Sequence, residues 1–208
     1  MTDQPDRPQL YLVTPAAFDP DVFAPKLARV LDGLPIACVR LAMAGSDEDA
    51  IARAADAVRE ETHARDIAIV IDRHVALVER LGLDGVHLPE GARGLRKLRD
   101  TLGADVIIGA GCGASRHDGI SAAEAGADYV AFAPVGETGL GSGARADRDL
   151  FAWWSEMIEV PVVAEGGLTL DLAADLAGIA DFIALGDEIW NAPEGPVAAL
   201  RSYAERLG

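Results

Sequence analysis

The sequence predicts one (β/α)₈ barrel over residues 1–208, in which residues 1–8 form a flexible tail. Short apolar runs recur along the chain, and a stretch of helical periodicity follows each run. Strands that are apolar throughout are typical of a parallel sheet covered by helices. Eight such units in 208 residues correspond to a small barrel of this class.

The expected strands lie at 10–14, 36–41, 67–71, 85–88, 105–109, 129–133, 161–167 and 182–186. The first helical pattern ends at 31, and the later ones cover 46–63, 75–81, 93–102, 115–125, 147–158, 170–176 and 196–207. Ser46, with Asp49 three residues later, is expected to cap the second helix.

A doubly wound open sheet is the alternative fold. Its dinucleotide fingerprint requires G-x-G-x-x-G after the first strand. The segment 10–18, "LYLVTPAAF", contains no glycine, and the glycine-rich segment 109–115 follows the fifth expected strand instead. The barrel is therefore the preferred fold.

Composition narrows the function classes. A net charge of −16 argues against nucleic acid and anionic membranes as partners. The only lysines, Lys26 and Lys97, fall in expected helices, which disfavours a Schiff-base mechanism. The distant Cys38 and Cys112 suggest reduced thiols in a cytoplasmic protein, and no apolar run approaches the ~18 residues of a membrane span. The polar N-terminal residues contain no signal-peptide core.

Barrel enzymes carry their active sites at the C-terminal ends of the strands. The cationic residues expected there are Arg40, Arg73, His74, His87, Arg116 and His117. Such a patch favours a small anionic ligand. Alternatively, Arg73, Arg116 and His117 are ordinary solvated loop charges.

Arg40 is expected to point into the barrel. In "IACVRL" it shares one strand face with Cys38, whereas Val39 and Leu41 occupy the other. A buried arginine requires a partner or a ligand, and we expect it to have a ligand-binding or catalytic role. Asp72 on the adjacent strand is the alternative, purely structural partner.

Glycines mark the ends of the last two strands. Gly166 and Gly167 follow the seventh strand and Gly186 follows the eighth, where barrels often bind phosphate through backbone N–H groups. The carboxylate of Asp187 would oppose a phosphate there, and the alternative is that the glycines only form tight turns.

The segment "LFAWWSEMI" concentrates aromatic residues on one expected helix. One barrel helix cannot easily bury Phe151, Trp153 and Trp154 together. A homodimer with one tryptophan at its interface is therefore expected.

Several segments, in order, resemble the thiamine-phosphate synthase and TenI superfamily: "YLVT", "DGVHL", "EAGADYVAFAPV", "PVVAEGGL" and "ALGDEIW". The resemblance covers nearly the whole chain and implies a (β/α)₈ barrel that handles thiamine intermediates. A synthase joins a pyrimidine pyrophosphate to a thiazole phosphate with Mg²⁺ and releases pyrophosphate. The TenI branch isomerises a thiazole ring.

At several positions aligned through this resemblance, the chain differs from the synthase pattern. Where the synthases have Gln-x-Arg-x-Lys, this chain has Cys38, Arg40 and Ala42, so only the arginine is kept. Arg73 and Ala92 stand at the positions of the metal-binding acids. No cofactor is therefore firmly expected, since Mg²⁺ prefers carboxylate oxygens. Asp72 and Glu90 are the alternative, displaced metal ligands.

The TenI pattern fits slightly better. Its loop after the fourth strand matches the segment around Glu90, and its Glu-Thr pair matches Glu137 and Thr138. Its catalytic histidine aligns with Pro134, so His87 or His74 would stand in as general base.

Three functions follow from the resemblance. The first is a divergent, metal-free activity on a phosphorylated thiazole or related anion. Arg40, His87 and His74 would be its catalytic residues, and its ligand would be bound by Asp72, Arg73, Glu90, Thr138, Gly166, Gly167 and Gly186. The alternatives are a genuine synthase with a rearranged site and a non-catalytic binding or regulatory barrel.

Overall fold

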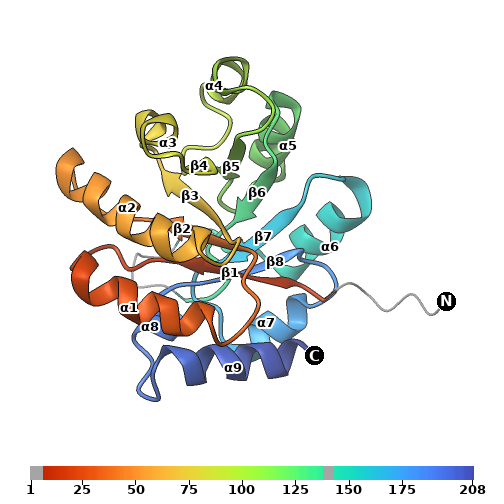
Figure 1. Cartoon of the computed structure of the whole chain (residues 1–208). Coiled ribbons are helices and arrows are strands. Elements are labelled where there is room, and N and C mark those ends of the chain that lie inside the picture. The colour runs from red at the N-terminus through yellow and green to blue at the C-terminus, as the bar shows by residue number, and fades with distance from the viewer. Residues whose placement is uncertain (1–6, 138–142) are drawn as a thin grey trace.

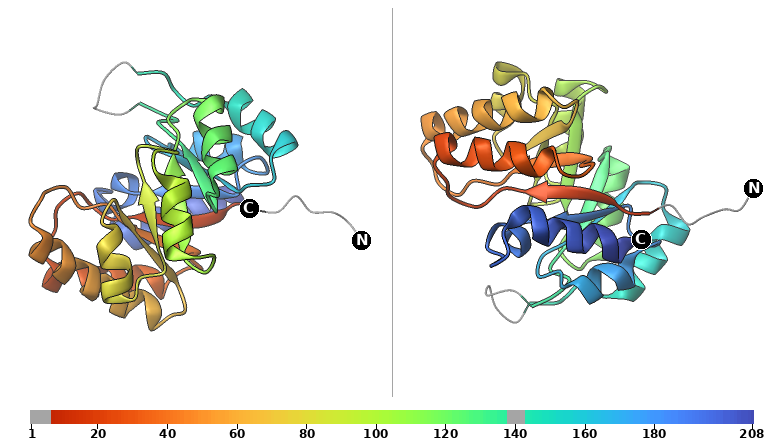
Figure 2. Two further views of the ribbon diagram at one scale, coloured as in Figure 1. Left: turned by 90° about the horizontal axis from the view of Figure 1, so that it is seen from above. Right: turned by 60° about the horizontal axis from the view of Figure 1, so that its bottom comes forward.

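The computed structural model describes residues 7–137 and 143–208 and confirms the predicted (β/α)₈ barrel. Its eight parallel strands close in sequence order from β1 to β8, and β8 pairs with β1. The helices form an outer layer around the strands (Figure 1). Helices α1 and α2 pack side by side on this layer (Figure 2).

The strands are β1 (Gln9–Val13), β2 (Cys38–Leu41), β3 (Ala68–Asp72), β4 (Gly85–Leu88), β5 (Ile107–Gly111), β6 (Tyr129–Phe132), β7 (Val162–Glu165) and β8 (Phe182–Leu185). The helices are α1 (Pro20–Leu31), α2 (Glu48–His63), α3 (Val75–Leu81), α4 (Leu95–Leu102), α5 (Arg116–Ala125), α6 (Arg148–Met157), α7 (Leu170–Leu176), α8 (Asp187–Trp190) and α9 (Pro196–Leu207).

Two apolar layers hold the barrel together. The larger lies between strands and helices and contains the outward strand residues, for example Val39 and Leu41 of β2. The smaller fills the barrel interior and includes Tyr11, Cys38 and Tyr129. This alternation confirms that Arg40 shares the inward face of β2 with Cys38, because side chains in a strand alternate between faces.

Strand β5 lies two residues later than the predicted 105–109 and includes two glycines, Gly109 and Gly111. A Cβ atom at Gly109 would lie 2.0 Å from Cζ of Tyr129 on the neighbouring strand. At Gly111 a Cβ would approach Nε2 of His87 to 3.3 Å. The missing side chains at Gly109 and Gly111 leave room in the barrel interior for the rings of Tyr129 and His87. Glycine is therefore used here although it weakens a strand.

Two local predictions are corrected. The N-cap of α2 is Asp47, whose side chain accepts a hydrogen bond from the N–H of Ala50 at 3.1 Å, and not Ser46. The short helix α8 was not predicted. It follows β8 directly and is fixed by Trp190, whose Nε1 donates to the carbonyl of Val13 at 2.7 Å.

Helix α6 buries more aromatic surface than expected. Phe151 and Trp154 are buried within the chain, so only the half-buried Trp153 remains available for the predicted homodimer interface.

Cys38 and Cys112 are free and buried. Among the described residues, no helix is both long and apolar enough to cross a membrane. Most of the predicted flexible tail (1–8) and Thr138 lie outside the described residues.

Replacing Gly109 with alanine is expected to destabilise the barrel by at least about 2 kcal/mol, because the new methyl group overlaps the Tyr129 ring. Urea unfolding followed by circular dichroism measures this loss. Gly143→Ala is the control, since a Cβ there meets no atom of the described residues within 4 Å, and its effect should stay within about 0.5 kcal/mol. Equal stability of the two variants would contradict the prediction.

A candidate active site at the carboxyl end of the barrel

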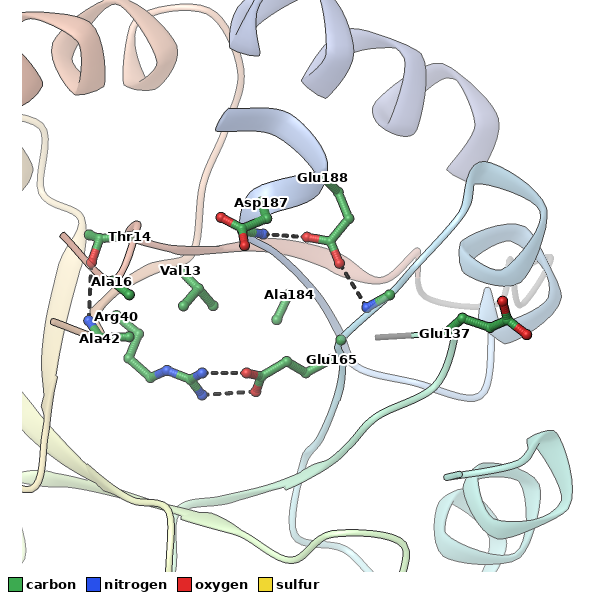
Figure 3. A pocket seen from close by; sticks show the side chains of 13 residues that line it. Val13, Thr14, Ala16, Arg40, Ala42, Glu137, Glu165, Ala184, Asp187 and Glu188 are labelled. Atoms are coloured by element: carbon green, nitrogen blue, oxygen red, sulfur yellow. Dashed lines mark hydrogen bonds and ion pairs between the residues drawn. The ribbon is translucent and has the colours of Figure 1, made fainter. Parts of the chain in front are cut away.

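An open cavity of about 850 Å³ lies at the carboxyl ends of β1, β2, β7 and β8 (Figure 3). It is lined by Val13, Thr14, Ala16, Arg40, Ala42, Glu137, Glu165, Gly166, Gly167, Ala184, Gly186, Asp187 and Glu188. Its position is the one that barrel enzymes use for their active sites.

Arg40 and Glu165 form the centre of the cavity floor (Figure 3). The guanidinium and the carboxylate meet in a two-pronged ion pair, in which Nη1 donates to Oε2 at 2.9 Å and Nη2 donates to Oε1. Arg40 is only 5% exposed, whereas Glu165 is partly exposed to the cavity. Fork-to-fork pairs of this kind are among the stronger hydrogen-bonded contacts in proteins.

Asp72 is the second carboxylate beside Arg40. Its Oδ1 lies 3.3 Å from Nε of Arg40, close enough for an ion pair. The orientation makes no hydrogen bond, and both atoms are buried without a hydrogen-bond partner among the described residues. Burial raises the pKa of Asp72 to about 6; Arg40 counteracts this shift, and Glu165 adds to it. The guanidinium of Arg40 thus forms two hydrogen bonds with Glu165 but only an ion-pair contact with Asp72.

A chain of polar contacts continues from Arg40 into the barrel interior. Nη1 of Arg40 lies 3.3 Å from Nε2 of His87, and Nδ1 of His87 lies 3.0 Å from the hydroxyl of Tyr129. The hydroxyls of Tyr129 and Tyr11 lie 2.8 Å apart. Burial, together with the nearby charge of Arg40, lowers the pKa of His87 well below its usual value. A neutral His87 therefore accepts from Arg40 and donates from Nδ1 to Tyr129.

The glycine loops after β7 and β8 bind a carboxylate of the chain itself. Oε1 of Glu188 accepts from the N–H groups of Gly167 at 2.9 Å and Leu168 at 3.2 Å. Its Oε2 accepts from the N–H of Gly186 at 2.8 Å. Gly166 contributes its carbonyl, which accepts from the N–H of Gly136 at 2.9 Å. Two of the three glycines predicted to bind phosphate thus bind Glu188, and Asp187 makes none of these contacts.

The loop after β6 presses against these glycines. Gly167 has φ +67°, and a Cβ atom there would lie 2.6 Å from the carbonyl oxygen of Glu137. This close approach brings Glu137 to the cavity rim, where it pairs with the exposed Arg145 at 3.0 Å. Glycine is therefore required at 167 by both its backbone conformation and its neighbours.

The charge of the cavity corrects the predicted cluster of cations. The described lining residues include one cation, Arg40, and four carboxylates, those of Glu137, Glu165, Asp187 and Glu188. The other predicted cations lie elsewhere. Arg73 pairs with Glu90 at 2.8 Å where both are exposed, and Arg116 lies over the Trp153 ring at 4.8 Å. His74, His87 and His117 do not line the cavity.

The residues do not fit a protein-held Mg²⁺. No group of three or more His, Cys, Asp or Glu side chains among the described residues is arranged to hold a metal ion. Asp72 and Glu90, the alternative ligands, each face an arginine instead. Arg73 and Ala92 offer no carboxylate oxygen, which Mg²⁺ prefers.

Glu165 and Glu188 are the site residues that were not predicted. The alternation that placed Arg40 inside the barrel also applies to β7, where Val163 and Glu165 face inward. A signal for Glu165 was therefore present in the sequence. Glu188 had none, because its contacts depend on how α8 packs.

Comparisons with known proteins give the family and support the fold. The family described as "Thiamine monophosphate synthase" matches residues 10–189. A thiamine-phosphate synthase of Rhodospirillum centenum is 44% identical over 198 residues, which cover 94% of this chain and 95% of that protein. One of Erythrobacter litoralis is 36% identical over 96% of this chain and 95% of its own length. The structure of a thiamine phosphate pyrophosphorylase of Pyrococcus furiosus superimposes with a TM-score of 0.80, at 22% identity and over 97% and 98% of the two chains, and supports the fold.

Replacing Arg40 with methionine is expected to destabilise the protein by about 3 kcal/mol, because Asp72 and Glu165 lose their shared cation. Chemical unfolding at neutral pH measures this loss. Arg73→Met is the matched control. It removes an exposed ion pair and should cost at most about 1 kcal/mol. An Arg40→Met protein as stable as the control would show that the two carboxylates do not depend on Arg40.

Proposed function

Since the chain belongs to the thiamine monophosphate synthase family, we propose that it joins a pyrimidine pyrophosphate to a thiazole phosphate, forming thiamine phosphate and pyrophosphate. The observation that carries this proposal is the cavity at the carboxyl end of the barrel, in a chain 44% identical to a named synthase. These relatives favour synthase activity over the metal-free activity inferred from Arg73 and Ala92.

The size of the cavity is compatible with the proposal. About 850 Å³ is within the range of pockets that bind drug-sized ligands and gives room for two joined rings. The ends of four strands contribute to its wall, so that both rings could be held over Arg40 and Glu165. Holding two reactants in one geometry is by itself a large part of catalysis for a two-substrate reaction.

The acidic lining suits the charge of the product. When the thiazole nitrogen attacks the methylene carbon of the pyrimidine, the bond to pyrophosphate breaks and the thiazole ring becomes a cation. Glu165 and the other lining carboxylates would stabilise this developing positive charge. Arg40 is the lining cation that could face the departing pyrophosphate.

A second candidate function has one observation in its favour. Arg73 and Ala92 offer no metal ligand, and the described residues do not form a three-ligand metal cluster. A barrel of this family with a metal-free activity on a thiazole ligand would need no such cluster. In this case His87 and His74, the proposed general bases, would have to act from outside the cavity lining.

An assay with both substrates, with Mg²⁺ or with a chelator, tests the proposed function. Thiamine phosphate is measured by its fluorescence after oxidation. We expect turnover by the unmodified chain and a loss of about 100-fold in kcat for Arg40→Lys, because lysine cannot reproduce the two-pronged pair with Glu165. Arg116→Lys, outside the cavity, should keep the activity of the unmodified protein.

The outcomes separate the two functions. No thiamine phosphate under either condition would contradict the proposed synthase. Turnover only with Mg²⁺ would show that the synthase reaction uses the ion although Arg73 and Ala92 offer it no carboxylate. Circular dichroism of Arg40→Lys at the assay temperature shows whether lost activity reflects lost structure.

A further inference from the structure

The guanidinium of Arg40 lies between two carboxylates, either of which it could bind. It forms hydrogen bonds with Glu165 through Nη1 and Nη2 (Figure 3), whereas its Nε lies 3.3 Å from Oδ1 of Asp72 without a hydrogen bond between the two atoms. A rotation of the guanidinium would exchange one pair for the other. A displacement of about 1 Å is enough to impair a catalytic contact, so the side chain needs a further partner that fixes its orientation.

His87 is this further partner of Arg40. Nη1 of Arg40 lies 3.3 Å from Nε2 of His87 and 2.9 Å from Oε2 of Glu165. Nη1 carries two hydrogens, so one hydrogen can point to each acceptor. The pair with Glu165 alone would allow the guanidinium to tilt, and the contact with His87 adds the point that fixes its plane.

The direction of the hydrogen bonds follows from the chemistry of arginine. Arginine only donates, so Nε2 of His87 has to accept and the ring proton has to lie on Nδ1. His87 is 3% exposed, and burial keeps its pKa low, so the neutral ring has a single N–H. Nδ1 lies 3.0 Å from the hydroxyl of Tyr129, which accepts this proton. Tyr129 in turn can donate to the hydroxyl of Tyr11 at 2.8 Å.

Packing holds the hydroxyl of Tyr129 beside His87. The two rings are nearly parallel, with an interplanar angle of 21° and centres 5.7 Å apart. A Cβ atom at Gly109 would lie 2.3 Å from the hydroxyl oxygen of Tyr129, so this position of the oxygen requires a glycine on β5. Burial raises the pKa of Tyr129, and its hydroxyl therefore remains neutral.

We propose that Tyr129 is a positioning residue for the synthase reaction: it accepts the Nδ1 proton of His87 and so keeps Nε2 as the acceptor that orients Arg40. The described lining of the cavity does not include Tyr129, so it acts through these two side chains. The proposal rests on the proposed function in one respect, because it takes Arg40 to face the departing pyrophosphate.

Loss of the Tyr129 oxygen would leave His87 two arrangements. Its proton could stay on Nδ1, buried without its present acceptor, or move to Nε2, where it would face an N–H of Arg40. A buried donor without an acceptor is costly, so the second arrangement is expected. Arg40 would then lose the contact that fixes its plane and could turn toward Asp72.

Kinetics of Tyr129→Phe, which keeps the ring and removes the oxygen, test this role. We expect kcat to fall at least about 10-fold and KM for either substrate to change by less than about 3-fold, because Arg40 acts on the transition state. Val163→Ala is the matched control. Val163 is 1% exposed in the same interior layer and has an apolar side chain, so kcat should stay within about 3-fold. Tyr11→Phe leaves the contact between His87 and Tyr129 in place and should lose less kcat than Tyr129→Phe.

The tautomer of His87 is a readout that does not depend on the substrates. Long-range ¹H–¹⁵N spectra show which imidazole nitrogen carries the proton. The chain has four histidines, and His87→Gln identifies the signals of His87. We expect the proton on Nδ1 in the unmodified protein and in Val163→Ala. Tyr129→Phe should show the form with the proton on Nε2.

The two readouts separate this proposal from the proposed function. A proton on Nε2 of His87 in the unmodified protein would overturn the proposal, also where Tyr129→Phe does not fold. An unchanged tautomer in Tyr129→Phe, or a loss of kcat no larger than that of Val163→Ala, would overturn it as well. A lack of thiamine phosphate formation by the unmodified protein would contradict the proposed function alone, and the change of tautomer would still support the effect of Tyr129 on His87.

Discussion

Arg40 provides the positive charge around which the carboxyl end of this barrel is arranged. Its guanidinium binds Glu165 through two hydrogen bonds, approaches Asp72 at 3.3 Å and contacts His87, so that residues of four strands meet at one side chain. Burying a charge without a partner costs free energy, and the two carboxylates beside Arg40 offset this cost. Because the pair with Glu165 is the better one, Oδ1 of Asp72 is buried without a hydrogen-bond partner in the described part of the chain.

This arrangement determines what the cavity offers a ligand. The cation at its floor, Arg40, is paired with Glu165. Glu188 likewise engages the backbone donors of the last two loops. Carboxylates of the chain itself thus satisfy Arg40 and the N–H groups of Gly167, Leu168 and Gly186. The acidic cavity suits a reaction whose product ring is cationic.

The sequence predicts the barrel and the inward direction of Arg40 because both depend on short-range periodicity. The same alternation on β7 indicates Glu165. The extension of β5 to Gly111 could not be predicted in this way, because this glycine packs against His87 of the neighbouring strand. The position of Glu188 depends on the contact of Trp190 with Val13, which are 177 residues apart in the chain. Tertiary contacts of this kind leave no local pattern.

The ionisation of Asp72 tests most directly whether one arginine serves two carboxylates. A pH titration of its ¹³Cγ resonance, assigned with Asp72→Asn, should give a midpoint of about 6, compared with the unperturbed 3.8. A carboxyl with a raised pKa in the folded state binds more protons there than in the unfolded state between these two values. Its contribution to stability should therefore fall as the pH rises from 3.8 to about 6, and the stability of Asp72→Asn should lack this decline. A midpoint at or below 3.8 would mean that Arg40 fully compensates the charge of Asp72, and it would contradict the unequal sharing of Arg40 between Asp72 and Glu165.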